Sequence, residues 1–289
     1  MPLTLRKLLI NNLTPMEAPQ ITIAMPVYNG EDYVHLAIQS VLDQTYSDFE
    51  LLIVDNCSTD RTLEVVKTFL DPRIRLFVNS TNLGMVGNWN RSIELATGEY
   101  IKFLSHDDLL DTTCLEEQIT GFLQYKQENI GIVTCKKRVI NKIGKIVIPG
   151  LGLRGQSRLI SGRVAIRKSI RSGRNIIGEP SVVLIKTSIL KASGPFELPE
   201  YTPDIKMWFK ILQKSNLYFI DKTLASYRIS EQSTSSSVSK SQGAQFVTLI
   251  HEIMKTDSTI IGKFNAKIGS SRSHLNSQLR RLITRISSS

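Results

Sequence analysis

Residues 21–66 decide the fold and read ITIAMPVYNGEDYVHLAIQSVLDQTYSDFELLIVDNCSTDRTLEVV. Two apolar runs of strand length, Ile21–Ala24 and Phe49–Val54, are each followed by polar turn residues. Between them, residues 31–44 carry apolar side chains at helical spacing, and a second helix is expected over Arg61–Leu70. The stretch therefore predicts the order strand, helix, strand, helix.

The alternation continues with a strand at Ile74–Val78, a helix at Val86–Ala96 and a strand at Tyr100–Leu104. Strands joined by helices at this spacing predict a parallel sheet with right-handed crossovers, in which ligands bind at the carboxyl ends of the strands. We therefore expect the polar loops after the four strands to converge on one cleft. These loops are Tyr28-Asn29, Asp55, residues 79–82 and Asp107-Asp108.

The remainder of the chain is less regular. The expected elements are a helix at Thr112–Gln127, a strand at Ile130–Thr134, a long mobile loop at Asn141–Arg174, a strand at Pro180–Ile185, a helix at Ile205–Leu212, a flexible Ser-rich segment at Ser230–Ser241 and helical structure over residues 243–285.

The composition is that of an ordinary globular protein of one large domain or two modest ones, with 289 residues, 41% hydrophobic and 21% charged. No apolar run approaches the roughly 20 residues of a transmembrane helix. Residues 1–19 do not predict a secretory signal, because they contain no long apolar region before a cleavage site. Three cysteines without a C-x-x-C pair argue against a disulfide framework or a Cys-based zinc site, and they suit a reducing cytoplasm.

The net charge of +10 is unevenly distributed. Residues 1–110 hold 8 Lys and Arg against 14 Asp and Glu, whereas residues 111–289 hold 28 against 12. Twelve basic residues and no acidic one lie between Glu128 and Glu179. Such a run indicates either a solvated face or an anionic partner, which could be a phosphate-bearing ligand, an acidic membrane surface or nucleic acid.

Four features are candidates for chemistry, and each has a plainer structural explanation. Asp107-Asp108 at a strand end could hold Mg²⁺ or Mn²⁺, or could begin a loop and cap a helix. Asp55 could accept a hydrogen bond from a base or ribose, or bond its own turn. The Pro26–Asn29 turn could line a ligand or merely connect a strand to a helix. Asp204 stands just ahead of the apolar helical stretch Ile205–Leu212, where its plainer explanation is an acid favoured by a helix dipole.

Taken together, five blocks in this order resemble the family-2 glycosyltransferases. The blocks are residues 21–66, NLGMVGNWNRSIELATGEYIKFLSHDD (82–108), IGEPSVVLIK (177–186), GPFELPEYTPDIKMWFKIL (194–212) and YRISEQSTS (227–235). The resemblance implies the α/β fold called GT-A, a Rossmann-like, mostly parallel sheet flanked by helices, with an acceptor-binding lobe and a C-terminal helical extension. It implies a nucleotide-sugar-binding half at residues 20–110, an acceptor-binding half of the same domain at 111–230, and a Ser-rich linker with a basic helical tail at 231–289.

The resemblance also implies a role for each matching residue. The base and ribose of the nucleotide would be lined by Pro26, Val27, Tyr28 and Asn29, and Asp55 would accept a hydrogen bond from the base. Asn88 would face the nucleotide, and Asp107 would hold the ribose or metal-bound water. Asp108 would bind the divalent cation, Mn²⁺ or Mg²⁺, Asp204 would be the general base, and Glu179 would contact the acceptor. The chain departs from the family pattern where Asn88-Trp89 stands in place of part of an Arg-Asn pair, and where Ser105, Pro203 and Ser230 replace an acid, an acid and a histidine.

The function implied is metal-dependent, inverting transfer of a sugar from a nucleoside-diphosphate sugar, most often a UDP-sugar, to a hydroxyl of a saccharide or glycolipid. The setting would be cell-surface polysaccharide or glycoconjugate synthesis in the cytoplasm, with peripheral contact at the inner face of an anionic membrane. The alternatives are an inactive nucleotide-sugar-binding homologue and a nucleotidyltransferase, which usually carries a Gly-rich loop with a Lys near its first strand. A nucleic-acid partner is not expected, because the basic residues do not alternate with aromatic ones.

Two basic segments have predicted positions. The Lys136–Arg174 stretch is expected to form a loop over the acceptor side or against anionic lipid. The C-terminal helix is expected to lie on a membrane, pack on the core or form a dimer contact; its apolar and basic residues are Leu275, Leu279, Leu282, Ile283, Ile286, Arg280, Arg281 and Arg285.

Overall fold

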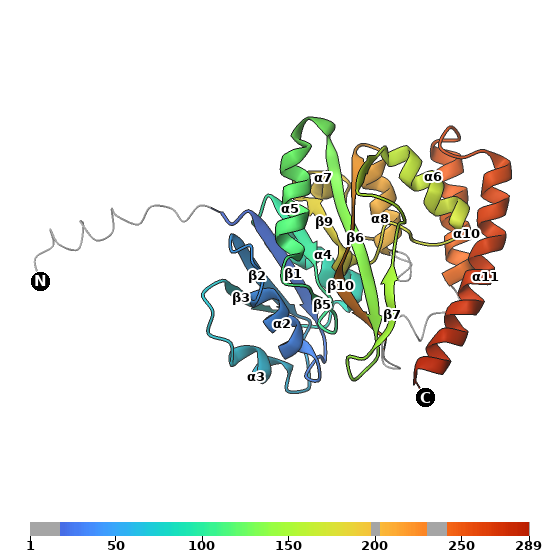
Figure 1. Ribbon diagram of the computed structural model, residues 1–289. Helices are drawn as coiled ribbons and strands as arrows, with labels where there is room; N and C mark the ends of the chain where they lie inside the picture. The colour runs from blue at the N-terminus through green and yellow to red at the C-terminus, as the bar shows by residue number, and fades with distance from the viewer. Residues whose placement is uncertain (1–17, 198–202, 230–241, 289) are drawn as a thin grey trace, which may run out of the picture.

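The computed structural model describes residues 18–197, 203–229 and 242–288, and its strands form one mixed sheet (Figure 1). The ten described strands include the path β3-β2-β1-β4-β9-β6-β10-β5, with β7 paired to β6 and β8 paired to β10. Figure 1 shows helices on both faces of this sheet, with the helix pair α10 and α11 at one end. The predicted α/β class is confirmed.

The strands are β1 (Ile21–Val27), β2 (Phe49–Asp55), β3 (Ile74–Val78), β4 (Tyr100–Phe103), β5 (Leu109–Leu110), β6 (Ile130–Ile140), β7 (Ile146–Leu151), β8 (Arg158–Ile160), β9 (Val183–Lys186) and β10 (Asn216–Arg228). The α-helices are α2 (Val34–Leu42), α3 (Thr62–Lys67), α4 (Gly84–Leu95), α5 (Cys114–Gln124), α6 (Gly162–Ser172), α7 (Thr187–Ala192), α8 (Pro203–Leu212), α10 (Gln242–Thr256) and α11 (Lys263–Ser288), with short 3₁₀ turns at Lys126–Glu128 and Pro180–Val182.

The first four strands pair in parallel, as the sequence predicted. Val27 at the end of β1 lies opposite Asp55 at the end of β2, and Asp55 lies opposite Val78 of β3. Strand β2 is buried at every position, which explains its uninterrupted apolar sequence. The carboxyl ends of these strands consequently meet at one edge of the sheet.

The second half of the chain extends the same sheet with mixed pairing. Strand β9 is antiparallel to both β4 and β6, whereas β6 and β10 are parallel to each other. Strand β10 was not expected from the sequence, because Asp221-Lys222 interrupts its apolar pattern at a register shift between Ile220 and Thr223. This strand carries the chain back to the edge where β1 to β4 end.

The expectation of a mobile loop over Asn141–Arg174 is wrong. The segment forms β7, β8 and α6, and it leaves only short connections. Helix α6 buries Ala165, Ile166 and Ile170 at helical spacing, while its basic side chains occupy the exposed face. The many basic residues made this amphipathic pattern hard to recognise in the sequence. Because the segment forms strands and a helix, the predicted basic loop over the acceptor side or against lipid is not present as a loop.

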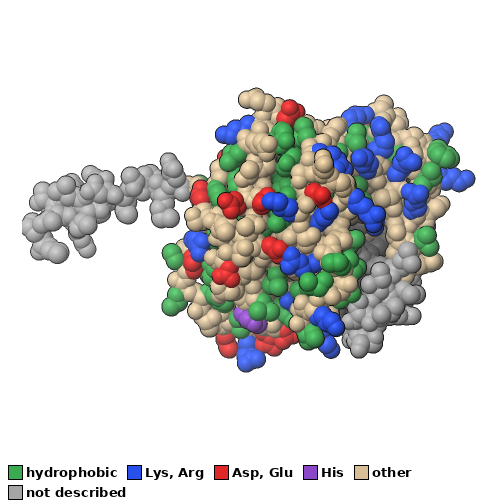
Figure 2. All heavy atoms as spheres, in the orientation of Figure 1, with side chains coloured by type: hydrophobic (Ala, Val, Ile, Leu, Met, Phe, Trp, Pro, Cys, Tyr) green, Lys and Arg blue, Asp and Glu red, His purple; other side chains and the backbone are tan. Residues whose placement is uncertain are grey.

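The expected C-terminal helical structure is present as two helices, α10 and α11, which pack on each other, and α11 also packs on α6. Gly269 of α11 lies against the carbonyl of Ile170, and Gly173 lies against the backbone of Arg272 and Ser273. The described part of α11 is therefore packed on the protein. Lys and Arg side chains gather over this end of the molecule (Figure 2).

Some expectations fall outside the described residues: those for the first seventeen residues, for the Ser-rich segment including Ser230, and for the side chains of Leu279 and beyond. Within the described part of the chain, none of the helices combines the length and the apolar character needed to cross a membrane.

Candidate functional site

The loops that follow the parallel strands converge, as the topology predicted. The N–H of Asn56 donates to the carbonyl of Val27 at 2.8 Å, and the N–H of Asn79 donates to the carbonyl of Asp55 at 2.9 Å. The loop after β4 reaches the loop after β1, because a Cβ on Gly30 would lie 2.6 Å from the ring of His106. Residues far apart in sequence thus form one polar edge.

Asp55 has an unsatisfied buried oxygen. Its side chain is inaccessible to solvent, and its Oδ2 accepts the N–H of Ser58 at 3.0 Å. Its Oδ1 is buried and has no hydrogen-bond partner among the described residues. A buried acceptor without a partner costs about 1–3 kcal/mol. A ligand that donates a hydrogen bond to Asp55 Oδ1 would remove this cost.

The predicted turn at the end of β1 exposes Tyr28 and Asn29. Val27 is buried, Pro26 is half-buried, and Tyr28 is 44% exposed. Asn29 adopts a left-handed φ of 50°, and its side-chain oxygen accepts the N–H of Thr59 at 2.9 Å. The turn is therefore held against the loop after β2, and the ring of Tyr28 is available for stacking.

Asn88 is committed to a network of asparagines. It is 3% exposed, its Nδ2 donates to the carbonyl of Val54, and its Oδ1 accepts from Asn79. Asn79 also donates to Asn56, whose own amide donates to Asn82. The structure does not bring Asn88 to an open surface, and its contacts are those of a residue that positions the strand ends.

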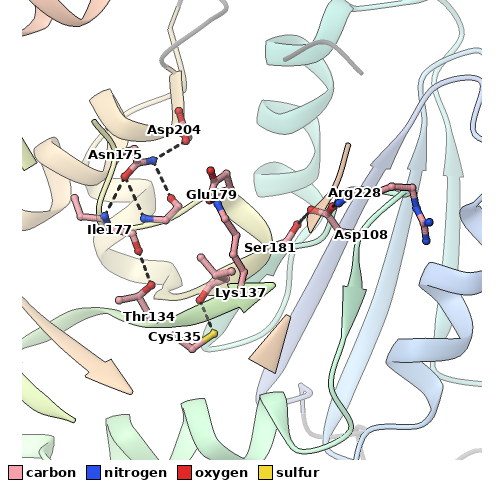
Figure 3. Close-up of polar contacts among 12 residues, drawn as sticks. Asp108, Thr134, Cys135, Lys137, Asn175, Ile177, Glu179, Ser181, Asp204 and Arg228 are labelled. Carbon is pink, nitrogen blue, oxygen red and sulfur yellow. Dashed lines mark hydrogen bonds and ion pairs between the residues drawn. The ribbon is translucent and has the colours of Figure 1, made fainter. Parts of the chain in front are cut away.

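The two acids after β4 have different environments (Figure 3). Asp108 is 1% exposed; its Oδ2 accepts the hydroxyl of Ser181, and its Oδ1 accepts the backbone N–H of Arg228 at 2.9 Å. Burial, and then the neighbouring Asp107 carboxylate, raise the pKa of Asp108 to about 7, although the two hydrogen bonds oppose this rise. The half-buried Asp107 carboxylate makes no hydrogen bond or ion pair with a described residue.

Arg228 closes this edge of the site. Its guanidinium is 2% exposed and donates to the carbonyls of Asp107, Asn141 and Lys142. It also lies 4.5 Å from the centre of the Tyr33 ring. Since its backbone N–H also bonds the carboxylate of Asp108, Arg228 contacts both acids and ties the β6–β7 turn to the loop after β4.

The loop of residues 175–182, which we call the bridging loop, connects the acids to Asp204. Asn175 donates through Nδ2 to Asp204 Oδ2 at 2.9 Å and to the carbonyl of Gly178, and its Oδ1 accepts the N–H groups of Ile177 and Gly178. At the other end of the loop, Ser181 holds Asp108. Figure 3 shows Glu179 on the bridging loop, with Asp204 on one side of it and Asp108 on the other.

Glu179 lies in the middle of the bridging loop and forms an ion pair with Lys137 of β6. The Lys137 ammonium also lies 4.9 Å from the centre of the Tyr227 ring. Both side chains of the ion pair are largely buried, at 7% for Lys137 and 19% for Glu179. The pair places a positive and a negative charge on the bridging loop between Asp108, the predicted metal ligand, and Asp204, the predicted base.

A divalent cation at this edge would need water and substrate oxygens as ligands in addition to a protein carboxylate. Among the described residues no group of three or more His, Cys, Asp or Glu side chains could hold a metal ion. One available carboxylate, that of Asp107, suits Mg²⁺ or Mn²⁺, which usually complete their shells with water and substrate phosphates. The Asp108 carboxylate is 1% exposed and already accepts one hydrogen bond on each oxygen, so it is less accessible to a cation than that of Asp107.

Sequence reasoning assigned no role to four residues of this network: Lys137, Asn175, Ser181 and Arg228. Ser181 and Arg228 fall within the resemblance blocks, so their positions were marked although their contacts were not. Lys137 sits in the basic stretch that was expected to form a loop over the acceptor side or against anionic lipid, and Asn175 precedes the block containing Gly178. Their roles depend on long-range contacts that the sequence does not show.

Comparisons with known proteins decide the family. The model of "Glycosyl transferase family 2" matches residues 22–160. The UDP-Glc:alpha-D-GlcNAc-diphosphoundecaprenol beta-1,3-glucosyltransferase WfgD of Escherichia coli is 32% identical over 234 residues, which cover 79% of this chain and 85% of that protein. The chain belongs to glycosyl transferase family 2. As the resemblance implied, this family-2 glycosyltransferase is a transferase enzyme.

Further relatives agree with this assignment. The putative teichuronic acid biosynthesis glycosyltransferase TuaG of Bacillus subtilis is 27% identical over 75% of this chain and 82% of its own. S. aureus TarS 1-349 in complex with UDP-GlcNAc has a TM-score of 0.69 at 19% identity, over 90% of this chain and 73% of that one. Mannosyltransferase PcManGT from Pyrobaculum calidifontis, in complex with GDP-Man and Mn²⁺, has a TM-score of 0.64 at 16% identity, over 94% and 75%. These structures confirm the GT-A fold.

Proposed function

We propose that this family-2 glycosyltransferase transfers a sugar from a UDP-sugar to a hydroxyl group of a saccharide or lipid-linked saccharide, with inversion at the anomeric carbon. The observation that carries the proposal is the bridging loop, which holds Asp108 at one end and Asp204 at the other. The arrangement supports a donor on one side of the loop and a base on the other. The printed names of WfgD and TarS, which include UDP-Glc and UDP-GlcNAc, support a uridine donor.

The nucleotide would bind at the carboxyl edge of β1 and β2. The unpaired Oδ1 of Asp55 would accept the imide N–H of uracil, which would satisfy a buried acceptor. The exposed ring of Tyr28 would stack on the base. Asn88 would act indirectly, because its hydrogen bonds hold the strand ends in place.

The diphosphate would lie over the acidic pair. We place the cation on Asp107, whose carboxylate has no partner among the described residues, and give Asp108 the task of fixing the loop through Ser181 and Arg228. This differs from the expectation that Asp108 binds the metal. A bound Mg²⁺ or Mn²⁺ would supply positive charge to stabilise the diphosphate as a leaving group.

Asp204 would act on the acceptor. It would take the proton from the acceptor hydroxyl as that oxygen attacks the anomeric carbon and the bond to the UDP oxygen breaks. A single displacement from the face opposite the leaving group inverts the carbon. Glu179, held by Lys137, would accept a hydrogen bond from another hydroxyl of the acceptor and orient it.

The setting we propose is the synthesis of a cell-surface polysaccharide or glycoconjugate, with the enzyme at the inner face of a membrane. The names of WfgD and TuaG, which include a diphosphoundecaprenol acceptor and teichuronic acid biosynthesis, support it.

The proposal is tested by measuring transfer from UDP-glucose and UDP-GlcNAc to a panel of saccharides and lipid-linked saccharides. Asp204→Asn should lower the transfer rate by about 10²–10⁴-fold while leaving UDP affinity unchanged, because it removes the base and little else. The matched control is Asp43→Asn, which makes the same change at an exposed position on the far end of α2. Full transfer by Asp204→Asn would refute the assigned base.

A further inference from the structure

Helices α6 and α11 lie side by side and present a strongly basic face (Figure 2). They are joined by Arg272, whose Nη1 donates to the carbonyl of Arg171, and by Asn276, whose amide donates to the carbonyls of Ser172 and Gly173. We call the exposed side chains of these two helices together the α6–α11 surface. Its exposed residues include Lys168, Arg171, Phe264, Lys267, Arg272 and Leu275.

The positive charge of this surface is not neutralised locally. Neither the sequence of α6 nor that of α11 contains an acidic residue. The acid next to the pair, Asp257, is already bonded to Arg163 at the start of α6. The side chains of Lys168, Arg171 and Lys267 make no hydrogen bond or ion pair with a described residue, so their charges face solvent.

Large apolar side chains stand among these charges. Phe264 is 77% exposed and Leu275 is 56% exposed. Phe264, Lys267, Ser271 and Leu275 follow the spacing of a single helical stripe, on the side opposite Gly269, which packs on α6. The same helix therefore uses one face for packing and shows solvent a second face of mixed apolar and basic character.

We propose that the α6–α11 surface docks on a bilayer that contains anionic lipid. Lys and Arg would lie at the level of the headgroups, while Phe264 and Leu275 would enter the boundary with the acyl chains. Exposed aliphatic and aromatic side chains together suit a lipid boundary better than nucleic acid, which is bound by basic grooves with stacking aromatics. The inference deepens the proposed function, on which it rests for the lipid-linked acceptor.

The test is cosedimentation of the full chain with vesicles of phosphatidylcholine alone, and of phosphatidylcholine with phosphatidylglycerol. Wild type should bind only the anionic vesicles and should be released by high salt. Lys168→Glu/Lys267→Glu should lower the partition coefficient at least about 25-fold, since each basic residue at an anionic surface contributes about fivefold. The matched control, Lys67→Glu/Lys126→Glu, makes the same change in charge at exposed positions on other elements and should bind normally.

A second variant tests insertion separately from charge. Phe264→Ser should weaken binding to anionic vesicles without changing its dependence on salt, because it removes apolar contact only. Equal binding of wild type to neutral and anionic vesicles, or normal binding by Lys168→Glu/Lys267→Glu, would overturn the inference. So would tight binding to a random oligonucleotide that is lost in that variant while vesicle binding is weak.

UDP affinity, measured in parallel, separates this inference from the function on which it rests. Loss of vesicle binding with unchanged UDP affinity is the result expected of Lys168→Glu/Lys267→Glu. If wild type bound UDP but no vesicle, the docking surface would be refuted and the donor site would stand. If it bound vesicles but neither UDP nor a UDP-sugar, the proposed function would fail and the surface would stand.

Discussion

Replacing Asn175 tests whether the bridging loop positions the base. The Asn175 side chain makes four hydrogen bonds: it donates to Asp204 and to the carbonyl of Gly178, and it accepts from the N–H groups of Ile177 and Gly178. Asn175→Ala removes all four in a half-buried loop. At about 1 kcal/mol each, with water replacing some, the variant should lose about 2–3 kcal/mol of unfolding free energy.

We expect Asn175→Ala to lower kcat by more than its loss of unfolding free energy alone would suggest. Asn175→Ala removes the hydrogen bond that ties Asp204 to the bridging loop, and a misplacement of about 1 Å can cost about 100-fold in rate. We expect kcat to fall by about 10–100-fold at a temperature where the variant is folded, with little change in UDP affinity. In an Asp204→Asn background the same substitution should have almost no further effect on kcat, since both changes act through one group.

The variant Asn175→Asp distinguishes positioning from a general loss of structure. It keeps the size of the side chain but places a second carboxylate beside Asp204, which disfavours ionisation of the base. The acidic limb of the kcat profile should therefore move to higher pH. An unchanged pH profile in Asn175→Asp, together with an unchanged kcat in Asn175→Ala, would refute the reasoning.

Three other predictions concern single residues. Gly178→Ala should lower the melting temperature by about 5–10 °C, because φ is +121° and the new Cβ would lie 2.2 Å from a methyl of Val182; thermal unfolding checks this, and an unchanged melting temperature would contradict it. Arg228→Met should cost about 3 kcal/mol in denaturant unfolding, because it leaves the partly buried carbonyls of Asp107, Asn141 and Lys142 without this donor; a loss below about 1 kcal/mol would count against the contacts described. Burial alone would raise the pKa of Glu50, but hydrogen bonds from Thr22 and Thr97 and from Arg75 outweigh it and lower the pKa, so stability should fall as the pH drops through the folded pKa of this group. In Glu50→Gln the free energy of unfolding should depend less on pH between about pH 6 and pH 3. The same dependence of unfolding free energy on pH in wild type and Glu50→Gln would refute this prediction.

The parallel half of the fold could be predicted because its signals are local. Strands such as Phe49–Val54 are continuous apolar runs, and the helices between them have clear periodicity. The second half was harder to predict. Helix α6 carries many cations on a sequence whose apolar residues are few, and β10 is interrupted at Asp221-Lys222. Pairing across the sheet, which no local pattern reports, determines these elements.

In the candidate site too, some features have a local signal in the sequence and others depend on long-range contacts. Asp55, Asp107 and Asp108 could be located because each follows a strand of the parallel sheet. The difference between Asp107 and Asp108 could not be foreseen, because it depends on Ser181 and on the backbone of Arg228, which are 73 and 120 residues away in sequence. Likewise, nothing local to Asn88 indicated that Asn79 and Val54 take up its amide.

Calorimetric titration with UDP, with and without Mn²⁺, tests the central claim most directly. Wild type should bind UDP more tightly with Mn²⁺, and Asp107→Asn should lose this enhancement. Asp55→Asn should weaken UDP binding by about 10–100-fold, the equivalent of one hydrogen bond to a charged group, whereas Asp43→Asn should bind like wild type. Equal affinity for UDP in wild type and Asp55→Asn, or no binding of UDP by wild type, would contradict the proposed donor site.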